Sequence, residues 1–429
     1  MKNFEYLDIN AKLLNLSEVI ESEIKYKFDN INEIMAFNEI KVLKAFIDSK
    51  ISATHFIEST GYGYGDLGRE KIDSLYSKVF EAQDSIVRAN FMSGTHTISV
   101  ALFGLLRPKH VMLNVTGTPY PTIHSTIGLK TSNKKNSLID YGIIYREIDI
   151  LNNISSDEVN LDVLKNNLDK NVRMVYIQRS KGYGTRPSLS IDAIEKISSF
   201  VHSINKNTIV LVDNCYGEFV QEKEPTSVGA DVICGSLIKN PGGAIAKCGG
   251  YIAGKKELVE LCADRLSAPG LGRDVGCNMN QNRDILLGLY IAPSFVGNAL
   301  KTSLFLRHLF NKIGFKVMPA LDERISDIVS VLQLNSKKAL ISFCEGIQQY
   351  SPIDSFVSPV PSAMPGYGNS VIMAAGTFVS GASLELTSDA QVCPPYNVFV
   401  QGGLCYHASK YCILKTVEKM INEKLIKIN

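Results

Sequence analysis

A lysine that directly follows an apolar run is the clearest starting point for chemistry in this sequence. Lys239 lies in DVICGSLIKNPGGAIAKCGGYIAG, a stretch that carries little charge. Poor solvation would make its amine easier to deprotonate, which a lysine that forms a Schiff base requires. Ser236 precedes it at Ser-x-x-Lys spacing and could offer a hydroxyl to a phosphate. Two alternatives stay open: a solvated loop lysine, and a serine acyl-transfer site, although the companion motifs of that class are missing.

An acidic residue ends a strongly apolar run in NTIVLVDNCYGEF. Asp213 would lie at the carboxyl end of a strand, where ligands bind in open parallel sheets. A buried carboxylate there needs a cationic or strongly donating partner. Tyr216, three residues later, could project into the same cleft. The alternatives are an aspartate that caps the turn and a tyrosine that only packs.

A third segment, FMSGTHTISVALFGLL, predicts a short strand, a loop of small residues and a helix. The backbone N–H groups at such a helix start form a site for a phosphate dianion, helped here by the hydroxyls of Ser93 and Thr95. Gly94 lies between them. The alternative is an ordinary serine or threonine cap on a core helix.

The stretch GYGYGDLGRE contains a formal Gly-x-Gly-x-x-Gly at Gly63, Gly65 and Gly68. This fingerprint binds a dinucleotide only where a buried strand runs into it and a helix leaves it. The residues before it predict a helix and a polar connector. The acid expected about 20 residues downstream would fall near Arg88, which has the wrong charge. A NAD-binding oxidoreductase is therefore the weaker hypothesis for this stretch.

Apolar runs alternate with helical patterns from about residue 85 and would position these residues. The runs are SIVRANF, HVMLNV, VRMVYIQ, NTIVLVD, DVICGSLI and GGYIAG, and TISVALFGLL and SIDAIEKISSFVHSI have helical spacing. Continuous apolar strands separated by helices predict an α/β fold with a mainly parallel sheet covered on both faces.

The flanking segments have a different texture. Residues 1 to about 50 have helical spacing with interleaved charges, which predicts an N-terminal helical arm. A long apolar segment begins at Arg283, and Pro293 should kink or divide it. The chain after about Gly314 predicts further strands, a proline-rich loop (SPVPSAMPGYG) and a C-terminal helix.

Composition excludes several classes of protein. The chain has 429 residues, a net charge of +2 and no basic block, which argues against nucleic acid as a partner. Its nine cysteines include no Cys-x-x-Cys pair, so we expect reduced thiols and no metal site. The N-terminus does not resemble a signal peptide, and no apolar run approaches the length of about 20 residues that spans a bilayer. We expect a soluble cytoplasmic protein without a membrane segment.

The order of these signals carries a resemblance to a known family. A phosphate loop, a strand-end aspartate and a lysine 26 residues after it resemble the fold-type I pyridoxal-phosphate (PLP) enzymes, in particular their Cys/Met-metabolism branch. The motifs SGTH, VDNCYGEF, GSLIKNPGGAIAKCGGYIAG and QGGLCY are similar to the methionine gamma-lyase-related group, also called cystathionine beta-lyase-like or aluminium-resistance proteins. The resemblance covers the chain from about Ile51 to the C-terminus.

This resemblance implies a PLP-dependent transferase-like fold with a mainly parallel seven-stranded sheet and a smaller α+β C-terminal domain. The implied boundaries are 1–55 for the helical arm, 56–295 for the large PLP-binding domain and 296–429 for the small domain. It also implies a homo-oligomer, a tetramer built from tight dimers, with active sites at subunit interfaces.

The resemblance also implies roles for individual residues. Lys239 would form the Schiff base with the cofactor and move protons at the substrate Cα and Cβ. Asp213 would keep the pyridine nitrogen protonated, so that the ring acts as an electron sink. Gly94, Thr95 and Ser236, with Ser93 beside them, would hold the 5′-phosphate.

Three tyrosines receive roles in the same way. Tyr120, in VTGTPYPTI, would stack on the cofactor ring, with a half-buried turn tyrosine as the alternative. Tyr216 could hydrogen-bond the phenolic oxygen of the cofactor. The family carries a Tyr-x-Arg pair that reaches the phosphate of the neighbouring subunit's cofactor. Here Tyr62 keeps the tyrosine, whereas Tyr64 stands where the family has arginine.

The substrate-binding residues are less well determined. Gln178 and Arg179 end the run VRMVYIQ, and Arg179 could clamp a substrate carboxylate, with a structural ion pair as the alternative. The better-known lyases place their carboxylate-binding arginine late in the chain. The comparable stretch here, GASLELTSDAQVCPP, has none, so Arg179 or Arg273 would have to replace it.

The leading hypothesis is a PLP-dependent carbon–sulfur lyase that acts by β- or γ-elimination on a small-molecule substrate, a sulfur-containing amino acid similar to methionine or cystathionine. A second hypothesis keeps PLP but changes the reaction to transamination, decarboxylation or aldol cleavage. A third is the NAD-binding oxidoreductase. A fourth is a protein that keeps the fold without catalysis, because fold does not fix function.

Overall fold

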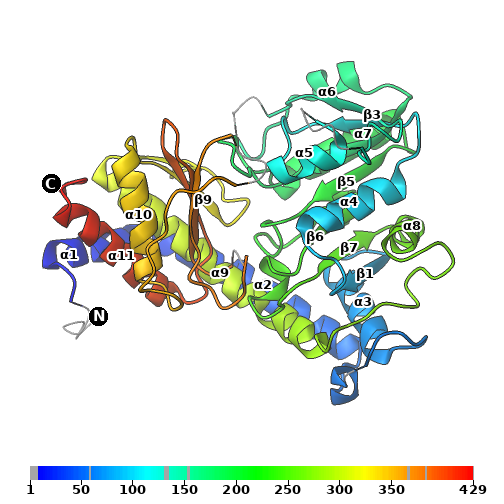
Figure 1. Ribbon diagram of the computed structural model, residues 1–429, viewed down its shortest axis with the longest axis horizontal. Coiled ribbons are helices and arrows are strands. Elements are labelled where there is room, and N and C mark those ends of the chain that lie inside the picture. Colours follow the sequence, from blue (N-terminus) through cyan, green and yellow to red (C-terminus); the bar gives the residue numbers. More distant parts are fainter. Residues whose placement is uncertain are drawn as a thin grey trace. The chain divides into compact units, whose positions relative to one another are not determined.

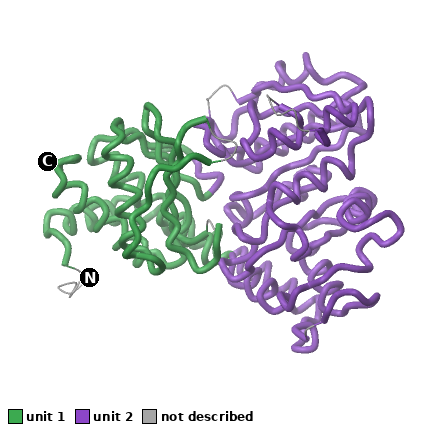
Figure 2. The backbone as a smooth tube through the Cα atoms, in the orientation of Figure 1, with its two compact units in different colours: residues 1–36, 293–323, 328–429 green, residues 37–292, 324–327 purple. Residues whose placement is uncertain are grey.

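The computed structural model describes residues 8–57, 59–129, 135–151, 155–364, 368–381 and 384–428. The chain forms two compact units (Figure 2). Unit 2 comprises residues 37–292 and 324–327, and unit 1 comprises residues 1–36, 293–323 and 328–429. The domain boundaries implied by the resemblance remain a prediction.

Unit 2 is built on a seven-stranded sheet with the order β1-β7-β6-β5-β4-β2-β3 (Figure 1). The pairs β2–β3, β2–β4, β4–β5 and β5–β6 are parallel, whereas β7 is antiparallel to both β6 and β1. The predicted mainly parallel, seven-stranded sheet is thereby confirmed. The strands are β1 (Asp84–Arg88), β2 (Val111–Asn114), β3 (Ile144–Glu147), β4 (Val172–Gln178), β5 (Ile209–Asp213), β6 (Val232–Ser236) and β7 (Gly250–Gly254).

Helices cover this sheet. They are α3 (Leu67–Val79), α4 (Gly94–Leu105), α5 (Pro121–Ile127), α6 (Leu161–Asn167), α7 (Ile191–Ile204) and α8 (Lys256–Leu266). Short 3-10 helices span Ala53–Phe56, Pro225–Val228 and Asn240–Gly242. Every residue of β5 and β6 is buried, as expected for strands that are covered on both faces.

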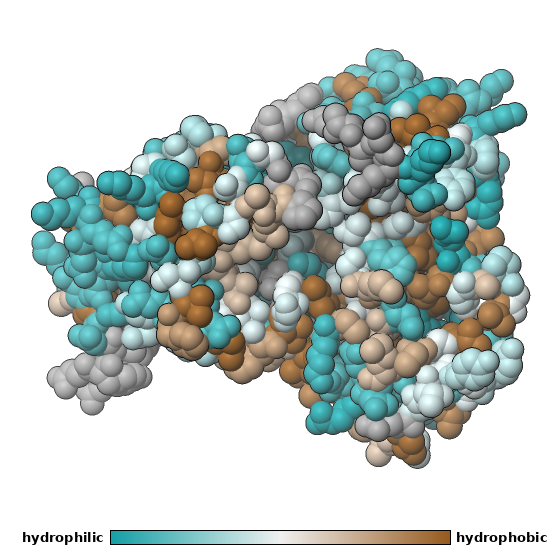
Figure 3. Space-filling view, viewed as in Figure 1, coloured by the Kyte–Doolittle hydropathy of each residue, from teal (hydrophilic) through white to brown (hydrophobic). Residues whose placement is uncertain are grey.

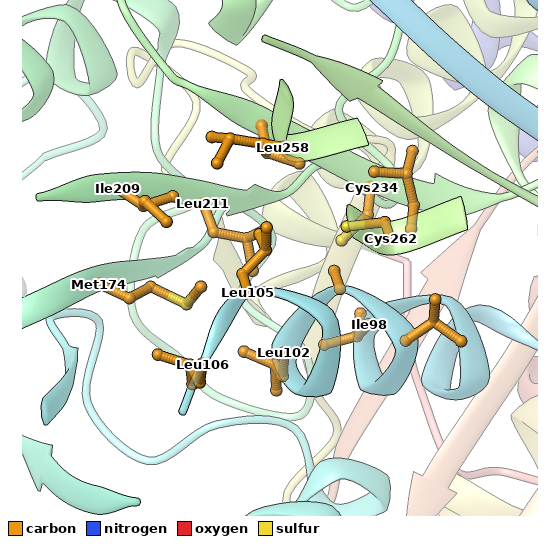
Figure 4. Close-up of a cluster of buried hydrophobic side chains, with 14 of the residues drawn as sticks. Ile98, Leu102, Leu105, Leu106, Met174, Ile209, Leu211, Cys234, Leu258 and Cys262 are labelled. Carbon is orange, nitrogen blue, oxygen red and sulfur yellow. The ribbon is translucent and has the colours of Figure 1, made fainter. Parts of the chain in front are cut away.

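The core on one face of the sheet explains where the site forms. Figure 4 shows Leu105 of α4 beside Leu211 of β5, within a buried cluster that also includes Tyr176 and Cys234. Side chains two positions apart on a strand share a face. Gln178, Asp213 and Ser236 each follow a cluster residue by two and thus continue this face at the carboxyl end of the sheet. The cluster therefore fixes α4 with its first turn at the same end.

Unit 1 contains an antiparallel five-stranded sheet with the order β10-β11-β12-β9-β8. Its strands are β8 (Lys316–Met318), β9 (Val329–Gln333), β10 (Val371–Ala374), β11 (Thr387–Gln391) and β12 (Asn397–Gln401), and its helices include α1 (Ala11–Glu23), α10 (Lys337–Gln349) and α11 (Tyr406–Asn422). This confirms the smaller α+β part of the predicted fold. Of the predicted proline-rich loop at 358–368, residues 365–367 lie outside the described residues.

Two long helices contribute residues to both units: α2 (Lys25–Asp48) and α9 (Asn282–Ile313). Pro293 lies inside α9 and does not divide it, contrary to one of the two outcomes expected from the sequence. Among the described residues, α9 is the one helix long and apolar enough, by length and composition only, to cross a membrane. This differs from the expectation that no apolar run approaches the length of a membrane span. Because 61% of its apolar window is buried inside the protein, α9 has the character of a core helix.

The polar character of the visible surface is consistent with the burial of the apolar helix α9. Hydrophilic residues are spread over the visible face of both units, and hydrophobic residues lie between them, singly and in small groups (Figure 3).

Candidate active site

A cavity of about 220 Å³ opens at the carboxyl end of the parallel strands of unit 2. The side chains predicted to do chemistry gather there from separate loops, since β1 runs in the same direction as β5 and β6. Its lining includes Ser93, Gly94, Thr95, Tyr120, Gln178, Asp213, Tyr216, Ser236 and Lys239. Of the predicted site residues, Tyr62, Arg179 and Arg273 are not part of this lining.

Lys239 and Tyr216 face each other in the cavity. The Lys239 Nζ lies 4.8 Å from the centroid of the Tyr216 ring, a distance at which an ammonium and an aromatic face attract. Tyr216 adopts a left-handed backbone conformation with φ +70°, which bulky residues rarely take. This conformation lets a residue on a tight turn present its ring to the lysine.

Asp213 is buried at the end of β5. Its Oδ1 accepts a hydrogen bond of 3.2 Å from the Cys215 N–H. Burial raises the pKa of Asp213, and the nearby Lys239 acts in the opposite direction. A buried carboxylate of this kind is stabilised by a cationic group in the cavity. A protonated ring nitrogen would satisfy this requirement.

The start of α4 and the end of β6 form a small cradle for an oxyanion. The Ser93 Oγ caps α4 by accepting the His96 N–H at 3.1 Å, and the Thr95 hydroxyl lies 2.7 Å from that of Thr122. Within the described part of the chain, the buried Ser236 Oγ has no hydrogen-bond partner. A Cβ at Gly94 would lie 3.3 Å from the Ser236 Cβ, so the two segments approach closely. An orphaned hydroxyl beside a helix N-terminus fits a phosphate.

Tyr120 forms another wall of the cavity. Its ring stacks on that of Tyr183, with centroids 5.6 Å apart and an interplanar angle of 15°. Its backbone N–H donates to the Gln178 Oε1 at 2.7 Å, and the Gln178 Nε2 donates to the Ser180 carbonyl at 2.9 Å. Gln178 therefore positions Tyr120 in the wall of the cavity. The sequence analysis missed Tyr183, for which the only signal was an aromatic residue between two glycines after a strand.

Arg179 lies outside the cavity lining and supports the turn that follows Asp213. Its guanidinium is fully buried, and its Nη1 donates to the Asn214 Oδ1 and the Gly217 carbonyl, both at 2.8 Å. The same atom lies 3.8 Å from a carboxylate oxygen of Glu224. A Cβ at Gly217 would lie only 2.5 Å from the Arg179 side chain. The structure thus favours the structural ion pair over the substrate clamp, because this arginine holds the turn that follows Asp213.

Arg273, the other arginine considered from the sequence, is also occupied. Its Nη1 and Nη2 donate to the two carboxylate oxygens of Asp84 at 2.9 and 2.6 Å. Hydrogen bonding and charge from Asp84 raise the pKa of Arg273 against the opposing effect of burial.

The lysine segment and the aspartate turn are tied together by a buried network. The Asn240 Nδ2 donates to the Glu218 carbonyl at 2.9 Å, and the Tyr251 hydroxyl donates to the Glu218 Oε1 at 2.8 Å. Burial raises the pKa of Glu218 to about 8. The turn at 214–218 is therefore fastened by Arg179 on one side and by Asn240 on the other.

The glycine-rich loop has a structure different from a dinucleotide site. The described residues before it form α2 and a 3-10 helix, without the strand that the fingerprint requires. Gly61 has φ +68°, and its carbonyl accepts hydrogen bonds from the Gly276 N–H at 3.0 Å and the Arg69 Nη1 at 2.9 Å. Tyr62 is 86% exposed. The geometry therefore gives no support to NAD binding, and the role of Tyr62 toward a neighbouring subunit remains a prediction.

Comparison with known proteins agrees with this geometry. The family model described as methionine gamma-lyase matches residues 13–421. An uncharacterized protein of Bacillus subtilis, YnbB, is 41% identical over 99% of this chain and 100% of its own length. An L-methionine gamma-lyase of Fusobacterium nucleatum subsp. polymorphum is 28% identical over 48% of this chain and 46% of its own length.

Solved structures extend the comparison. A proposed cystathionine beta-lyase involved in aluminium resistance, from Listeria monocytogenes, superposes with a TM-score of 0.92 at 41% identity, covering 95% of this chain and 99% of that chain. Yeast cystathionine gamma-lyase superposes with a TM-score of 0.59 at 15% identity, covering 88% of this chain and 98% of that chain. The yeast likeness shows the fold alone, and the fold is that of the fold-type I PLP enzymes.

Proposed function

The chain belongs to the methionine gamma-lyase family, and we propose that it is a PLP-dependent carbon–sulfur lyase acting by β- or γ-elimination on a sulfur-containing amino acid. The observation that carries the proposal is one cavity that holds both Asp213 and Lys239, beside the cradle of Gly94 and Ser236. The products would be a thiol, ammonia and a 2-oxo acid.

The lining residues divide into groups that suit different parts of the cofactor. The Ser236 hydroxyl, the Thr95 hydroxyl and the backbone at Gly94 would hold the phosphate. Asp213 would hold a proton on the ring nitrogen. Tyr120, already stacked on Tyr183, would offer its face to the ring. When bound, the cofactor supplies an electron sink for negative charge at the substrate Cα.

Lys239 would attach the cofactor and then act as general base and acid. Its Nζ lies beside the aromatic face of Tyr216, so it is held in the cavity. Its amine would take the proton from the substrate Cα and return a proton to the departing sulfur. Tyr216 would offer its hydroxyl to the phenolic oxygen of the cofactor.

A single subunit supplies little positive charge for the phosphate. Lys239 is the one cationic side chain among the described residues that line the cavity. We therefore keep the proposal that Tyr62 of a second copy completes the phosphate site. A homotetramer of tight dimers would provide that arrangement.

The first test is the variant Lys239→Ala. The purified wild-type protein loaded with PLP should absorb visible light and release a thiol from a sulfur-containing amino acid, and the variant should lose both properties because its attachment point is missing. Absorbance spectra and a thiol assay with quantified ammonia measure these outcomes.

Lys247→Ala is the matched control. Lys247 lies in the same segment but is exposed, and its amine pairs with Asp284 at 3.1 Å, so its loss should change neither property. An unchanged visible spectrum in Lys239→Ala would overturn the assignment. Amino-group transfer to an added 2-oxo acid, in place of thiol release, would move the protein to the transaminase alternative.

A further inference from the structure

The substrate's carboxylate lacks an evident partner in the site described above. Arg179 and Arg273 are committed to Glu224 and Asp84, and Lys239 is reserved for the cofactor. An amino-acid lyase nevertheless needs a cation for the α-carboxylate, because a carboxylate in a half-closed site is otherwise poorly solvated. Cations that contact the lining residues are therefore the remaining candidates.

Arg186 is such a cation. Its Nη2 donates to the Gln178 carbonyl at 2.8 Å and to the Ser180 carbonyl at 2.6 Å, and both of these residues line the cavity. Its Nη1 donates to the Pro187 carbonyl at 2.8 Å. The guanidinium therefore contacts the backbone of two residues of the cavity lining, although Arg186 itself is not part of that lining. Two of its five N–H donors remain after these three bonds.

The charge of Arg186 is not matched by a nearby acid. Among the described residues, no carboxylate lies within 4.0 Å of the Arg186 guanidinium. The guanidinium groups of Arg179 and Arg273, in contrast, each have a carboxylate within this distance. Asp327, Asp149 and Asp213 act on Arg186 from greater distances, and Asp327 is already paired with Lys181 at 2.9 Å. Burial lowers the pKa of Arg186 to about 10, so the side chain stays charged at neutral pH. A partly desolvated cation without a counterion is stabilised by an anionic ligand.

The loop that carries Arg186 is held rigidly at the cavity. The Gly184 N–H donates to the Lys181 carbonyl at 2.9 Å, and the Lys181 N–H donates to the Ser188 Oγ at 3.1 Å. Tyr183, in the middle of the loop, stacks on Tyr120 of the cavity wall. A group on this loop would therefore be positioned before the substrate arrives, as tight binding requires.

We propose that Arg186 binds the α-carboxylate of the amino-acid substrate, which rests on the proposed lyase function. In this arrangement, Arg186 replaces the late arginine that the chain lacks. The carbonyls of Gln178 and Ser180 orient the guanidinium, and its remaining N–H groups would donate to the carboxylate oxygens. Selectivity for amino acids over amines then depends on this one side chain.

The experiment compares two probes that differ only in the carboxylate, L-methionine and 3-(methylsulfanyl)propylamine. Each is mixed with the PLP-loaded protein at a series of concentrations, and the visible spectrum is read before thiol is released, so that the measurement reports binding and not turnover. Wild type should bind the amino acid more tightly than the amine. In Arg186→Met the affinity for methionine should fall by roughly 30-fold or more, because one partner of a desolvated charge pair is removed. The affinity for the amine should stay within about twofold, because it makes no contact with the removed charge.

Arg186→Lys should fall between these values because it keeps a cation but not the planar fork. Arg324→Met is the matched control, since Arg324 is an exposed arginine of the same unit that pairs with Asp157 and Asp192. It should bind both probes as wild type does. Thermal unfolding and the affinity for PLP of each variant show whether the fold and the cofactor site are intact.

Three outcomes would overturn the inference. Equal losses for both probes, or no loss for methionine in Arg186→Met, would exclude a carboxylate contact. Loss of PLP with retained discrimination between the probes would assign Arg186 to the phosphate. If the wild-type protein neither absorbs visible light with PLP nor releases a thiol, the proposed lyase function itself fails, which is distinguishable from a failure confined to the variant.

Discussion

Tyr216 takes a backbone conformation that is unfavourable for a bulky residue, and its neighbours explain why it persists there. Asn214, two residues before Tyr216, accepts a hydrogen bond from Arg179. Gly217, the next residue after Tyr216, has no room for a side chain because Arg179 fills that space. Such conformations cost of order 1–3 kcal/mol and persist only where surrounding contacts determine them. The result is an aromatic face fixed against Lys239. The strain is thus located at the residues that would do the chemistry.

Glu218, in the same turn, should make stability depend on pH. Its folded pKa of about 8 lies above the ordinary 4.5, so the folded state binds a proton that the unfolded state has released between these values. The free energy of unfolding should therefore fall as pH rises from about 5 to about 8, by an amount on the order of a few kcal/mol. In Glu218→Gln, which keeps the shape but cannot ionise, this loss should disappear. Urea unfolding at pH 5.5 and pH 8.5 measures the difference.

The comparison has a built-in control, because the other ionisable groups are shared by both proteins. The Glu218→Gln variant should gain stability relative to wild type between the lower and the higher pH. Parallel pH profiles for the two proteins would show that Glu218 ionises normally and that burial does not act as described.

At the scale of elements, the sequence predicted the strands that have continuous apolar runs. β4, β5 and β6 were found because they are buried on both faces. β3, with the sequence IYRE, was missed because it lies at the edge of the sheet, where its end residues are exposed and need not be apolar. Pro293 did not divide α9, since tertiary packing of a long apolar helix outweighs one missing N–H group.

The same contrast explains which site residues could be predicted. Asp213 and Lys239 stand directly after strong strands, so the strand pattern locates them. Arg179 was found by that rule, but its buried partners lie 35 to 45 residues away along the chain, in another loop. Arg186 was missed because it lies in the loop after Ser180, where no periodicity places a side chain. Tertiary contacts decide whether an arginine supports the backbone or binds the substrate, and the sequence pattern does not show them.

The buried contacts of Arg179 lead to a prediction about the free energy of unfolding. In Arg179→Met the buried Glu224 loses its cationic neighbour, and the amide of Asn214 loses a donor. Removing one partner of a buried pair typically destabilises by about 3–5 kcal/mol. Denaturant unfolding of the cofactor-free protein measures this directly. Arg324→Met, which removes an exposed pair, should change the free energy of unfolding by less than about 1 kcal/mol.

The outcome separates the two roles considered for this residue. A stable Arg179→Met variant that loses only affinity for the amino-acid substrate would restore the substrate clamp. A destabilised variant whose defect in PLP binding parallels its unfolding would support the positioning role.

At the scale of the whole molecule, the glycine-rich loop is the feature that a single subunit leaves unexplained. Tyr62 and Tyr64 are largely exposed, yet they lie on a loop whose backbone is anchored at Gly61. Exposed aromatic side chains on a fixed loop are typical of a contact surface. The cavity, in turn, has few cations for a phosphate. The two observations would be reconciled if Tyr62 of one copy completes the site of another.

This arrangement predicts complementation between two inactive variants. Lys239→Ala lacks the attachment point and Tyr62→Ala lacks the donated tyrosine, so each alone should have little activity. In a mixed dimer, the site that uses Lys239 of the Tyr62→Ala subunit receives Tyr62 of the partner subunit and is complete. Random mixing at equal concentrations gives mixed dimers in half of the population, each with one intact site, so activity should recover to about a quarter of wild type. Thiol release after joint unfolding and refolding measures it, with each variant refolded alone as the control. If Tyr62 instead served its own subunit, neither site of a mixed dimer would be complete, and no activity would return.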